Sequence, residues 1–316
     1  MPAAVIAIAP ADAEWENCAE AMFGWRQRAQ IEMAGKELHR AHWLAHGHHA
    51  IASLACGVAG LVLCGCAGPG RVPAPNTTIG QPFNRPLTSA VLDAPLVASN
   101  GRRLTLASFT GKVLVISDFM SLCQESCPMD TANVVAGARA VERAGLGDKV
   151  EFVSVTVDPH RDTPMQLAAY RMLYGPAPAD WMVLTGSQAA VDGFWKDLGV
   201  YIHKTVDTPP LPHNWRTGKP LKYDITHSDA VFFLDGSGHE RFLLMGIPYV
   251  AKDTSIPPRL LAFMDAEGHR NLTHPPQDAW TVPQELQVLS WLVQRHITTN
   301  ANLAVKGSSV ARVGPR

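Results

Sequence analysis

Residues 113–128 read VLVISDFMSLCQESCP, the most informative stretch of the chain. Its first seven residues are mostly apolar and include three β-branched side chains, which is typical of a buried strand. Cys123 and Cys127 follow where that strand ends, and Pro128 suits the first position of a helix that we expect to run to about Ala144. The stretch therefore predicts a strand that leads through a pair of thiols into a helix.

The strand-to-helix pattern repeats further along the chain. We expect further strands at 150–157, 181–184, 229–234 and 240–245, and further helices at 164–173, 187–198 and 283–296. Alternating strands and helices imply parallel strands in the centre of the sheet. The fold class is therefore α/β and thioredoxin-like, a central mixed sheet with helices on both faces, and the site is expected at the carboxyl end of the first central strand.

The composition indicates a globular protein. The chain has 316 residues, a formal net charge of -1 and 47% hydrophobic residues, which is too apolar and too weakly charged for a disordered chain. A net charge near zero gives no reason to expect nucleic acid as a partner. Four of the six cysteines lie in the first 66 residues, so the globular part has only one close pair. Such a pair more often indicates redox or metal chemistry than a disulfide framework.

An uncharged apolar run, AIASLACGVAGLVLC, occupies residues 50–64. It has the length of a signal-peptide core and is shorter than the about 20 residues that span a bilayer. Residues 63–66, LCGC, resemble a bacterial lipobox, although Cys64 stands where a small residue is usual. We expect Cys66 to be lipidated, which would hold the protein on the extracytoplasmic face of the cell membrane. An uncleaved anchor and a buried helix are the alternatives.

The segment before the apolar run is too long for a signal peptide. A start at Met33 would leave a basic segment of suitable length, so we interpret residues 1–32 as a start-site artefact and 1–66 as the signal and lipobox region. The histidines within 39–49 precede the expected cleavage point, which argues against a metal site there. Residues 67–80 are expected to form a flexible tether.

Cys123 and Cys127 lie just before a helix, where the dipole and free N–H groups favour thiolate, so we expect their pKa to fall. The three-residue gap is wider than in the common redox pair, and it can present two sulfurs to a metal and still close into a disulfide. An imidazole would complete a copper site. His227, just before the strand at 229–234, is the leading candidate, against the alternative of an ordinary hydrogen-bonded histidine.

Three stretches together resemble the Sco/SenC family of copper-binding assembly factors. They are CQESCP at 123–128, VDPHRDTP at 157–164 and YDITHS at 223–228, and the resemblance covers roughly residues 79–247. Two features depart from the family pattern. Gln124, Glu125 and Ser126 separate the cysteines where the family commonly has proline and aspartate, and residues 248–280 look like an insertion that either contacts a partner or is inert.

The resemblance implies a thioredoxin fold, and with the expected elements it places a thioredoxin-like domain at residues 81–299, with the insertion at 248–280. Residues 300–316 have the composition of a C-terminal tail. It also implies that Cys123, Cys127 and His227 bind copper, as Cu(I) or Cu(II). Members of the family help to assemble the dinuclear copper centre of cytochrome c oxidase. The implied partner is therefore the copper-centre subunit of that oxidase.

Two main functions remain open at this level. A copper metallochaperone would need both cysteines and His227. A thiol–disulfide oxidoreductase would use Cys123 and Cys127 as its catalytic redox pair to reduce the cysteines of a copper acceptor, and it would have little need for His227. His227 favours the metallochaperone. A peroxidase is a weaker third function, because the residues before Cys123 lack the proline and threonine pattern of a peroxidatic cysteine.

Some neighbouring residues have both a functional and a structural interpretation. We expect Asp162 or Thr163 to cap the helix that begins at Pro164, and Asp158 either to support the metal loop or to end a strand. Met120 and Met129 are soft donors that we expect to pack in the core, and His213 lies in a loop that could bring it to the site as an auxiliary ligand.

Overall fold

A computed structural model of the chain describes residues 71–299. The expected lipobox with Cys66, the start at Met33 and the tail at 300–316 lie outside the described residues. The part of the tether that is described, 71–80, begins with a contact to the body of the protein. There Val72 is buried, and its carbonyl accepts a hydrogen bond from Gln294.

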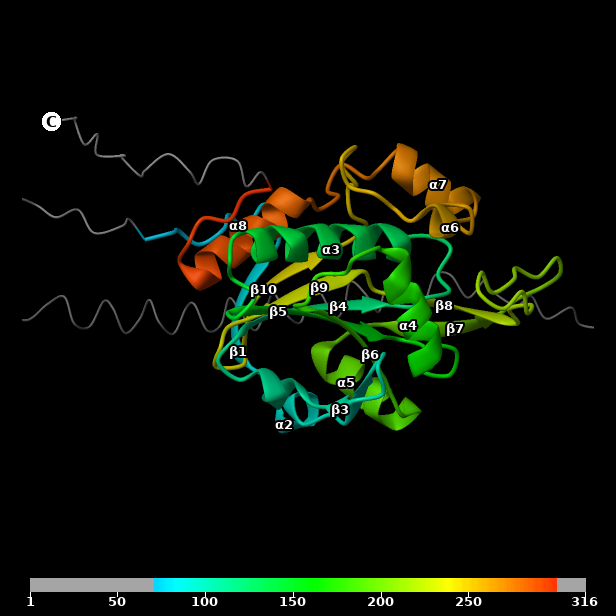
Figure 1. The fold of residues 1–316 in the computed structure, drawn as a ribbon, viewed down its shortest axis with the longest axis horizontal. Coiled ribbons are helices and arrows are strands. Elements are labelled where there is room, and N and C mark those ends of the chain that lie inside the picture. The colour runs from blue at the N-terminus through cyan, green and yellow to red at the C-terminus, as the bar shows by residue number, and fades with distance from the viewer. Residues whose placement is uncertain (1–70, 300–316) are drawn as a thin grey trace, which may run out of the picture. The chain divides into compact units, whose positions relative to one another are not determined.

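Eight strands form one sheet in the order β1-β10-β9-β4-β5-β6-β2-β3 (Figure 1). They are β1 (Gln81–Pro86), β2 (Leu96–Ala98), β3 (Arg103–Leu104), β4 (Val113–Phe119), β5 (Val150–Thr156), β6 (Trp181–Gly186), β9 (Ala230–Leu234) and β10 (His239–Met245). The three central strands β4, β5 and β6 are parallel, and β9 runs antiparallel to β4. The predicted mixed sheet with a parallel centre is confirmed.

Helices cover both faces of the sheet, as expected. Figure 1 shows α3 (Cys127–Arg143) and α8 (Val282–Val293) on one face, and α2 (Ser89–Leu92) and α5 (Gln188–Leu198) on the other. The short 3-10 helix η1 (Leu106–Phe109) follows β3. The hydroxyls of Ser187 and Thr281 cap α5 and α8 by accepting a backbone N–H from the first turn.

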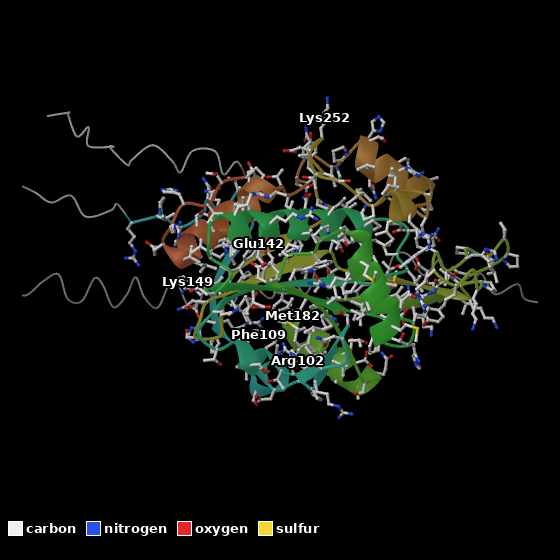
Figure 2. All side chains as sticks on the ribbon, in the orientation of Figure 1. Arg102, Phe109, Glu142, Lys149, Met182 and Lys252 are labelled. Carbon is white, nitrogen blue, oxygen red and sulfur yellow. The ribbon has the colours of Figure 1, made fainter. Side chains whose placement is uncertain are left out.

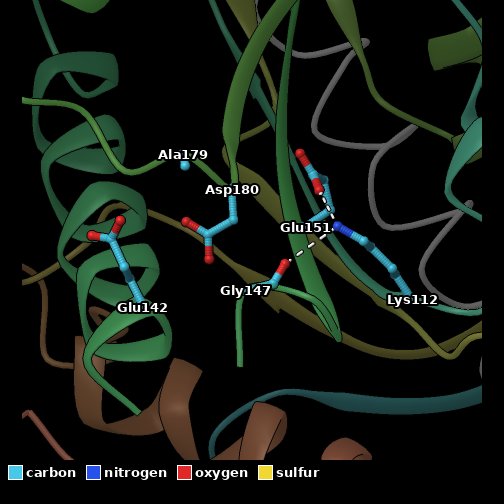
Figure 3. A pocket seen from close by; sticks show the side chains of 6 residues that line it. All are labelled: Lys112, Glu142, Gly147, Glu151, Ala179 and Asp180. Carbon is cyan, nitrogen blue, oxygen red and sulfur yellow. Dashed lines mark hydrogen bonds and ion pairs between the residues drawn. The ribbon is translucent and has the colours of Figure 1, made fainter. Parts of the chain in front are cut away.

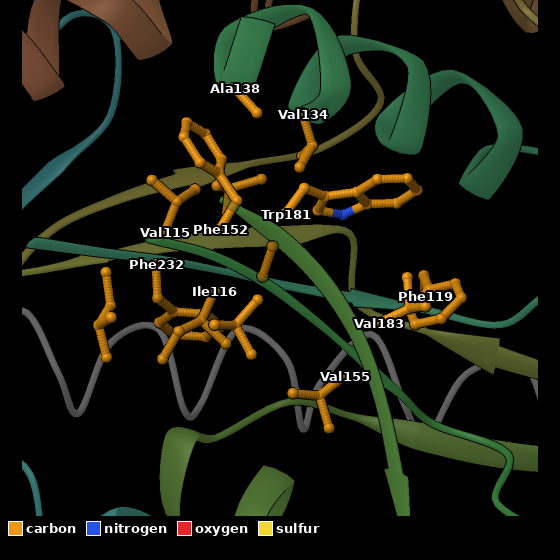
Figure 4. Packing of buried hydrophobic residues seen from close by; sticks show 14 of the residues in the cluster. Val115, Ile116, Phe119, Val134, Ala138, Phe152, Val155, Trp181, Val183 and Phe232 are labelled. Carbon is orange, nitrogen blue, oxygen red and sulfur yellow. The ribbon is translucent and has the colours of Figure 1, made fainter. Parts of the chain in front are cut away.

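The core lies between the sheet and its helices. Figure 4 shows Val115, Phe152 and Trp181 beneath Val134 and Ala138 of α3, and all five are at most 1% exposed. Ile116, Val155 and Phe232 pack on the other face of the sheet. Because successive side chains of a strand point to opposite faces, strands covered on both sides read as continuous apolar runs. This burial holds the carboxyl end of β4, and so the thiols, in a fixed place.

Two parts of the chain have more regular structure than the sequence indicated. Residues 202–227 contain a separate two-stranded hairpin of β7 (Ile202–Val206) and β8 (Tyr223–His227), where only an approach to a strand was expected. The insertion 248–280 contains α6 (Pro258–Leu261) and α7 (Ala266–Thr273). Within the described residues, no helix is long and apolar enough to span a membrane.

Candidate metal and dithiol site

The three candidate ligands come from three different elements. Cys123 lies in the loop between β4 and α3, which we call the cysteine loop (residues 120–126), and Cys127 is the first residue of α3. His227 is the last residue of β8. The Cys127 Sγ and His227 Nε2 atoms are 3.3 Å apart. The structure therefore brings His227 onto one of the two thiols, across a sequence separation of 100 residues.

The start of α3 points its N–H groups at the Cys123 sulfur. The backbone N–H groups of Glu125 and Cys127 both donate to Cys123 Sγ at 3.4 Å. Free N–H groups at a helix N-terminus favour negative charge on a nearby atom. Both cysteines are free thiols and almost fully buried, with 6% of Cys123 and 1% of Cys127 exposed.

The other ring nitrogen of His227 fixes the orientation of the imidazole. Nδ1 lies 2.9 Å from the carbonyl oxygen of Ser228, which can only accept, so Nδ1 carries a hydrogen. The Oδ2 atom of Asp118 lies 3.7 Å from the same nitrogen and has no hydrogen-bond partner of its own. In the neutral ring, the lone pair is then on Nε2, which faces Cys127. Metal-binding histidines usually have this arrangement.

Burial and neighbouring charges shift the pKa values of Cys127, His227 and Asp118. Burial raises the pKa of the Cys127 thiol well above its usual range, and the hydrogen bond and charge of Cys123 add to this. The expectation that the pKa falls is therefore wrong for Cys127, because desolvation outweighs the helix dipole. Burial alone would lower the pKa of His227, but Asp118 and Asp229 raise it to about 10. Burial also raises the pKa of Asp118.

Asp162 organises the cysteine loop and does not cap a helix. Its carboxylate accepts hydrogen bonds from the backbone and hydroxyl of Ser121 and from the hydroxyl of Thr156. Asp162 is fully buried, which raises its pKa to about 6, mainly through desolvation. Thr163 supplies the expected cap of α4 (Pro164–Leu173) by accepting from the N–H of Gln166. Asp162 thus ties the start of the loop to the end of β5.

Asp158 belongs to a second network, which reaches the strand that carries His227. Its carboxylate accepts hydrogen bonds from Arg161 and from the Tyr223 hydroxyl, the latter at 3.0 Å. Arg161 also donates to the Tyr223 carbonyl at 2.6 Å and lies 4.0 Å from the centroid of its ring. Since Tyr223 begins β8 and His227 ends it, this contact helps to place β8 against the parallel strands.

The remaining candidates are structural or lie apart. Met120 and Met129 are at most 2% exposed and belong to the hydrophobic core, as expected. His213 is exposed on the loop after β7, where its backbone pairs with Pro220. His203 is exposed on β7 and stacks on Tyr201. None of the hydrogen bonds found among residues 71–299 joins either histidine to a cysteine.

The donor set of two thiols and an imidazole fits a soft metal ion. Among the described residues, no group of three His, Cys, Asp or Glu side chains is arranged to hold a metal as it stands. Two ligands at about 2.3 Å (sulfur) and about 2.0 Å (nitrogen) from one ion lie roughly 3.5 Å apart. Cys127 and His227 have nearly this spacing, and the Cys123 sulfur accepts N–H groups from the same turn in which Cys127 stands.

A cavity of ≈ 230 Å³ lies elsewhere, at the amino ends of the central strands (Figure 3). It is lined by Lys112, Glu142, Gly147, Glu151, Ala179 and Asp180. Lys112 Nζ bridges the Glu151 carboxylate at 2.8 Å and the Gly147 carbonyl at 3.3 Å, and burial raises the pKa of Asp180 to about 6. Cys123 follows the carboxyl end of β4, so this cavity is not part of the dithiol site.

The sequence reasoning missed Asp118, the supporting role of Asp162 and the contacts of residues 248–280 with the cysteine loop. Asp118 carried a usable signal, since it is the one charged residue in the apolar run 113–119 and it comes just before the thiols. A buried carboxyl beside a candidate ligand often tunes that ligand. Asp162 lies in a proline-containing turn, where a cap is the more common role.

The fold and the site together define a thioredoxin-like protein with a buried C-x-x-x-C dithiol that faces a histidine. A model of the SCO1/SenC family matches residues 91–247. The chain is 27% identical over 145 residues to the "SCO1 protein homolog" of Bacillus subtilis, covering 46% of this chain and 68% of that one. It is 27% identical over 143 residues to "Protein sco1" of Schizosaccharomyces pombe, covering 45% of this chain and only 50% of the yeast protein. The chain belongs to the SCO1/SenC family.

Solved structures of Sco proteins are also similar. Copper-bound ScoI of Arabidopsis thaliana is 22% identical, with 56% of this chain and 91% of that chain covered and a TM-score of 0.39. Copper-bound ScoI of Bradyrhizobium japonicum is 21% identical, with 58% and 96% covered and a TM-score of 0.39. A SCO1/SenC family lipoprotein of Bacillus anthracis is 24% identical, with 58% and 95% covered and a TM-score of 0.42.

Proposed function

We propose that this protein is a copper metallochaperone that takes part in assembling the dinuclear copper centre of a cytochrome c oxidase. Cys123, Cys127 and His227 would bind the copper, and the copper-centre subunit of the oxidase would be the acceptor. The observation that carries the proposal is the 3.3 Å approach of His227 Nε2 to Cys127 Sγ, with the other ring nitrogen held by a carbonyl. Family membership supports it, because Sco proteins of other organisms have been solved with copper bound.

Soft thiolates and an imidazole suit copper in both common oxidation states. Binding requires that both thiols and the imidazole lose their protons to the surroundings. Because the environment raises the pKa of both Cys127 and His227, copper displaces protons from the site, and its affinity falls as the pH is lowered. Burial of all three side chains keeps competing water away from the ion.

The test is copper binding by the reduced protein beside His227→Ala, with His203→Ala as the matched control on the exposed side of the same hairpin. We expect one copper per chain in the wild type and in His203→Ala, with thiolate-to-Cu(II) absorption bands. In His227→Ala those bands should collapse and the affinity should fall by about a hundredfold or more, since one ligand of three is lost. Equal binding in all three proteins would reject the three-ligand site.

A thiol–disulfide oxidoreductase is the second candidate. It is favoured by the two free thiols at a helix N-terminus, with two N–H groups directed at the Cys123 sulfur. A disulfide switch has been identified in BsSco, described as a member of the Sco family of cytochrome c oxidase assembly proteins. A protein that reduces acceptor disulfides equally well with and without His227 would support this alternative.

We also propose that lipid on Cys66 anchors the protein at the extracytoplasmic face of the membrane. The lipobox-like residues 63–66 and the preceding apolar run support this proposal. A Sco family relative from Bacillus anthracis is described as a lipoprotein.

A further inference from the structure

Residues 248–280 lie beyond the part of the chain that the family model matches, yet they pack on the cysteine loop. Figure 1 shows α6 and α7 lying over the end of α3 at which the cysteines are found. The exposed Lys252 extends outward from this segment (Figure 2). The segment therefore has one face toward solvent and another toward the site.

Two hydrogen bonds join the segment to the residue that follows Cys123. The backbone N–H of Asp265 donates to the Gln124 carbonyl at 3.0 Å. The Gln124 side chain donates in return, from Nε2 to the Phe263 carbonyl at 2.8 Å. Gln124 is thus held through both its backbone and its side chain.

Gly268 in the first turn of α7 lies directly against the same peptides. A Cβ atom at this position would stand 2.3 Å from the Gln124 carbonyl oxygen and 3.1 Å from that of Glu125. Both are backbone atoms, which cannot move away by changing a rotamer. The Asp265 carboxylate caps α7 by accepting the Gly268 N–H at 2.8 Å, so the turn that meets the loop is itself fixed.

The segment is anchored firmly enough to restrain the loop. Leu260, Met264 and Trp280 are each at most 6% exposed and belong to the main core. Asn133 of α3 donates to the Tyr249 carbonyl at 3.0 Å. A movement of the Gln124 and Glu125 peptides away from α7 must therefore break contacts with an element that is packed on the body of the protein.

We propose that residues 248–280 form a clamp on the cysteine loop, and that Gly268 and Asp265 are its positioning residues. Both thiols are buried, and the Cys123 sulfur is held by N–H groups of the peptides at Glu125 and Cys127, so the dithiol reacts only when the loop shifts. The clamp limits how often that shift occurs. The expected effect on copper release rests on the proposed function. The expected effect on the exposure of the two thiols does not depend on it.

The test compares Gly268→Ala with Gly193→Ala in the full chain. Gly193 is also a helical glycine, on α5, and a Cβ there meets nothing within 4 Å. The first readout is the rate at which iodoacetamide alkylates Cys123 and Cys127 in the native protein, and the second is copper release to a chelator. We expect Gly268→Ala to raise both rates by about five- to thirtyfold, as the loss of one hydrogen bond and its packing would do, and Gly193→Ala to match the wild type.

Gln124→Ala is the second variant, in case Gly268→Ala does not fold. It removes the bond to the Phe263 carbonyl and leaves α7 intact, and we expect a smaller increase in alkylation, with circular dichroism unchanged. Wild-type alkylation rates in folded Gly268→Ala and in Gln124→Ala would overturn the clamp. Faster alkylation in a protein that binds no copper would sustain the clamp and reject the metallochaperone. Copper binding together with unchanged alkylation rates would reject the clamp and support the metallochaperone.

Discussion

At the scale of single residues, Asp118 decides how well His227 can act as a ligand. One oxygen of its carboxylate accepts the N–H of Ala230 at 3.1 Å, and the other faces His227 Nδ1 at 3.7 Å without a hydrogen bond. The carboxylate therefore favours a hydrogen on Nδ1 and leaves the lone pair on Nε2, the atom that would bind copper in the proposed site. It does so from β4, which also leads to the thiols.

We predict that Asp118→Asn weakens copper binding about tenfold. The amide can still accept from Ala230, but its NH₂ group would then face the Nδ1–H, so the imidazole loses its electrostatic partner. Affinity would be measured by competition with a chelator of known strength, with the exposed Asp192→Asn as control. An unchanged affinity in a folded Asp118→Asn protein would mean that the Ser228 carbonyl alone orients the ring.

The sequence indicated the three candidate ligands at this scale, but it did not indicate the residues that hold them in place. Recognisable motifs contain Cys123, Cys127 and His227. The order of the strands and helices between these motifs indicates that the chain comes back toward the cysteines before the strand at 229–234. Asp162 also stands in a motif, but its contacts with Ser121 and Thr156 join two strand ends that only the sheet brings together. Side-chain partners that are distant in sequence leave no local pattern.

At the scale of elements, α8 packs on α3 through a buried carboxyl. Glu285 is fully buried, neither of its oxygens has a hydrogen-bond partner, and desolvation raises its pKa well above the usual range. It fills the space beside Gly137, where a Cβ would stand 2.3 Å from Oε2. The interface thus contains a group that is tolerated mainly in its neutral form.

We predict that Glu285→Gln makes the protein more stable at pH 8 but changes little at pH 4. The folded state holds the proton more tightly than the unfolded state, so wild-type stability falls as the pH rises above the unfolded pKa of about 4.3. The neutral amide of Gln removes that pH dependence. At pH 8 we expect the free energy of unfolding to exceed that of the wild type by on the order of 1–2 kcal/mol. Urea unfolding at both pH values measures it, with the exposed Glu142→Gln on α3 as control. A parallel pH dependence in wild type and Glu285→Gln would contradict this assignment.

Elements with strong periodicity could be predicted, and those formed by packing could not. The strand Val113–Phe119 and the helix Pro164–Leu173 have the predicted bounds, because apolar runs, prolines and caps mark them in the sequence. The helices α6 and α7 lie in a proline-rich segment with four and eight residues respectively. Helices this short form mainly through tertiary contacts, so the local sequence indicates them poorly.

At the scale of the whole molecule, the site is assembled from the middle of the chain and covered by its C-terminal part. The thiols follow β4, His227 ends a hairpin outside the main sheet, and residues 248–280 close over the loop from the far side of α3. The order of strands and helices in the sequence could predict that the thiols follow β4. The contact of residues 248–280 with the cysteine loop involves a segment outside the family match. Neither the hydrophobic pattern of the sequence nor the resemblance to the family could therefore predict it.

The N-terminal region supplies the last prediction, which concerns where this assembled site works. If Cys66 is the lipidated residue, Cys66→Ser should abolish incorporation of labelled fatty acid and release the protein from the membrane fraction, since lipid chains supply the anchoring energy. Cys64→Ser is the matched control, two residues earlier in the same LCGC sequence, and it should keep both the label and the membrane location. Labelling that persists in Cys66→Ser, or a membrane location without any label, would instead favour an uncleaved anchor formed by residues 50–64.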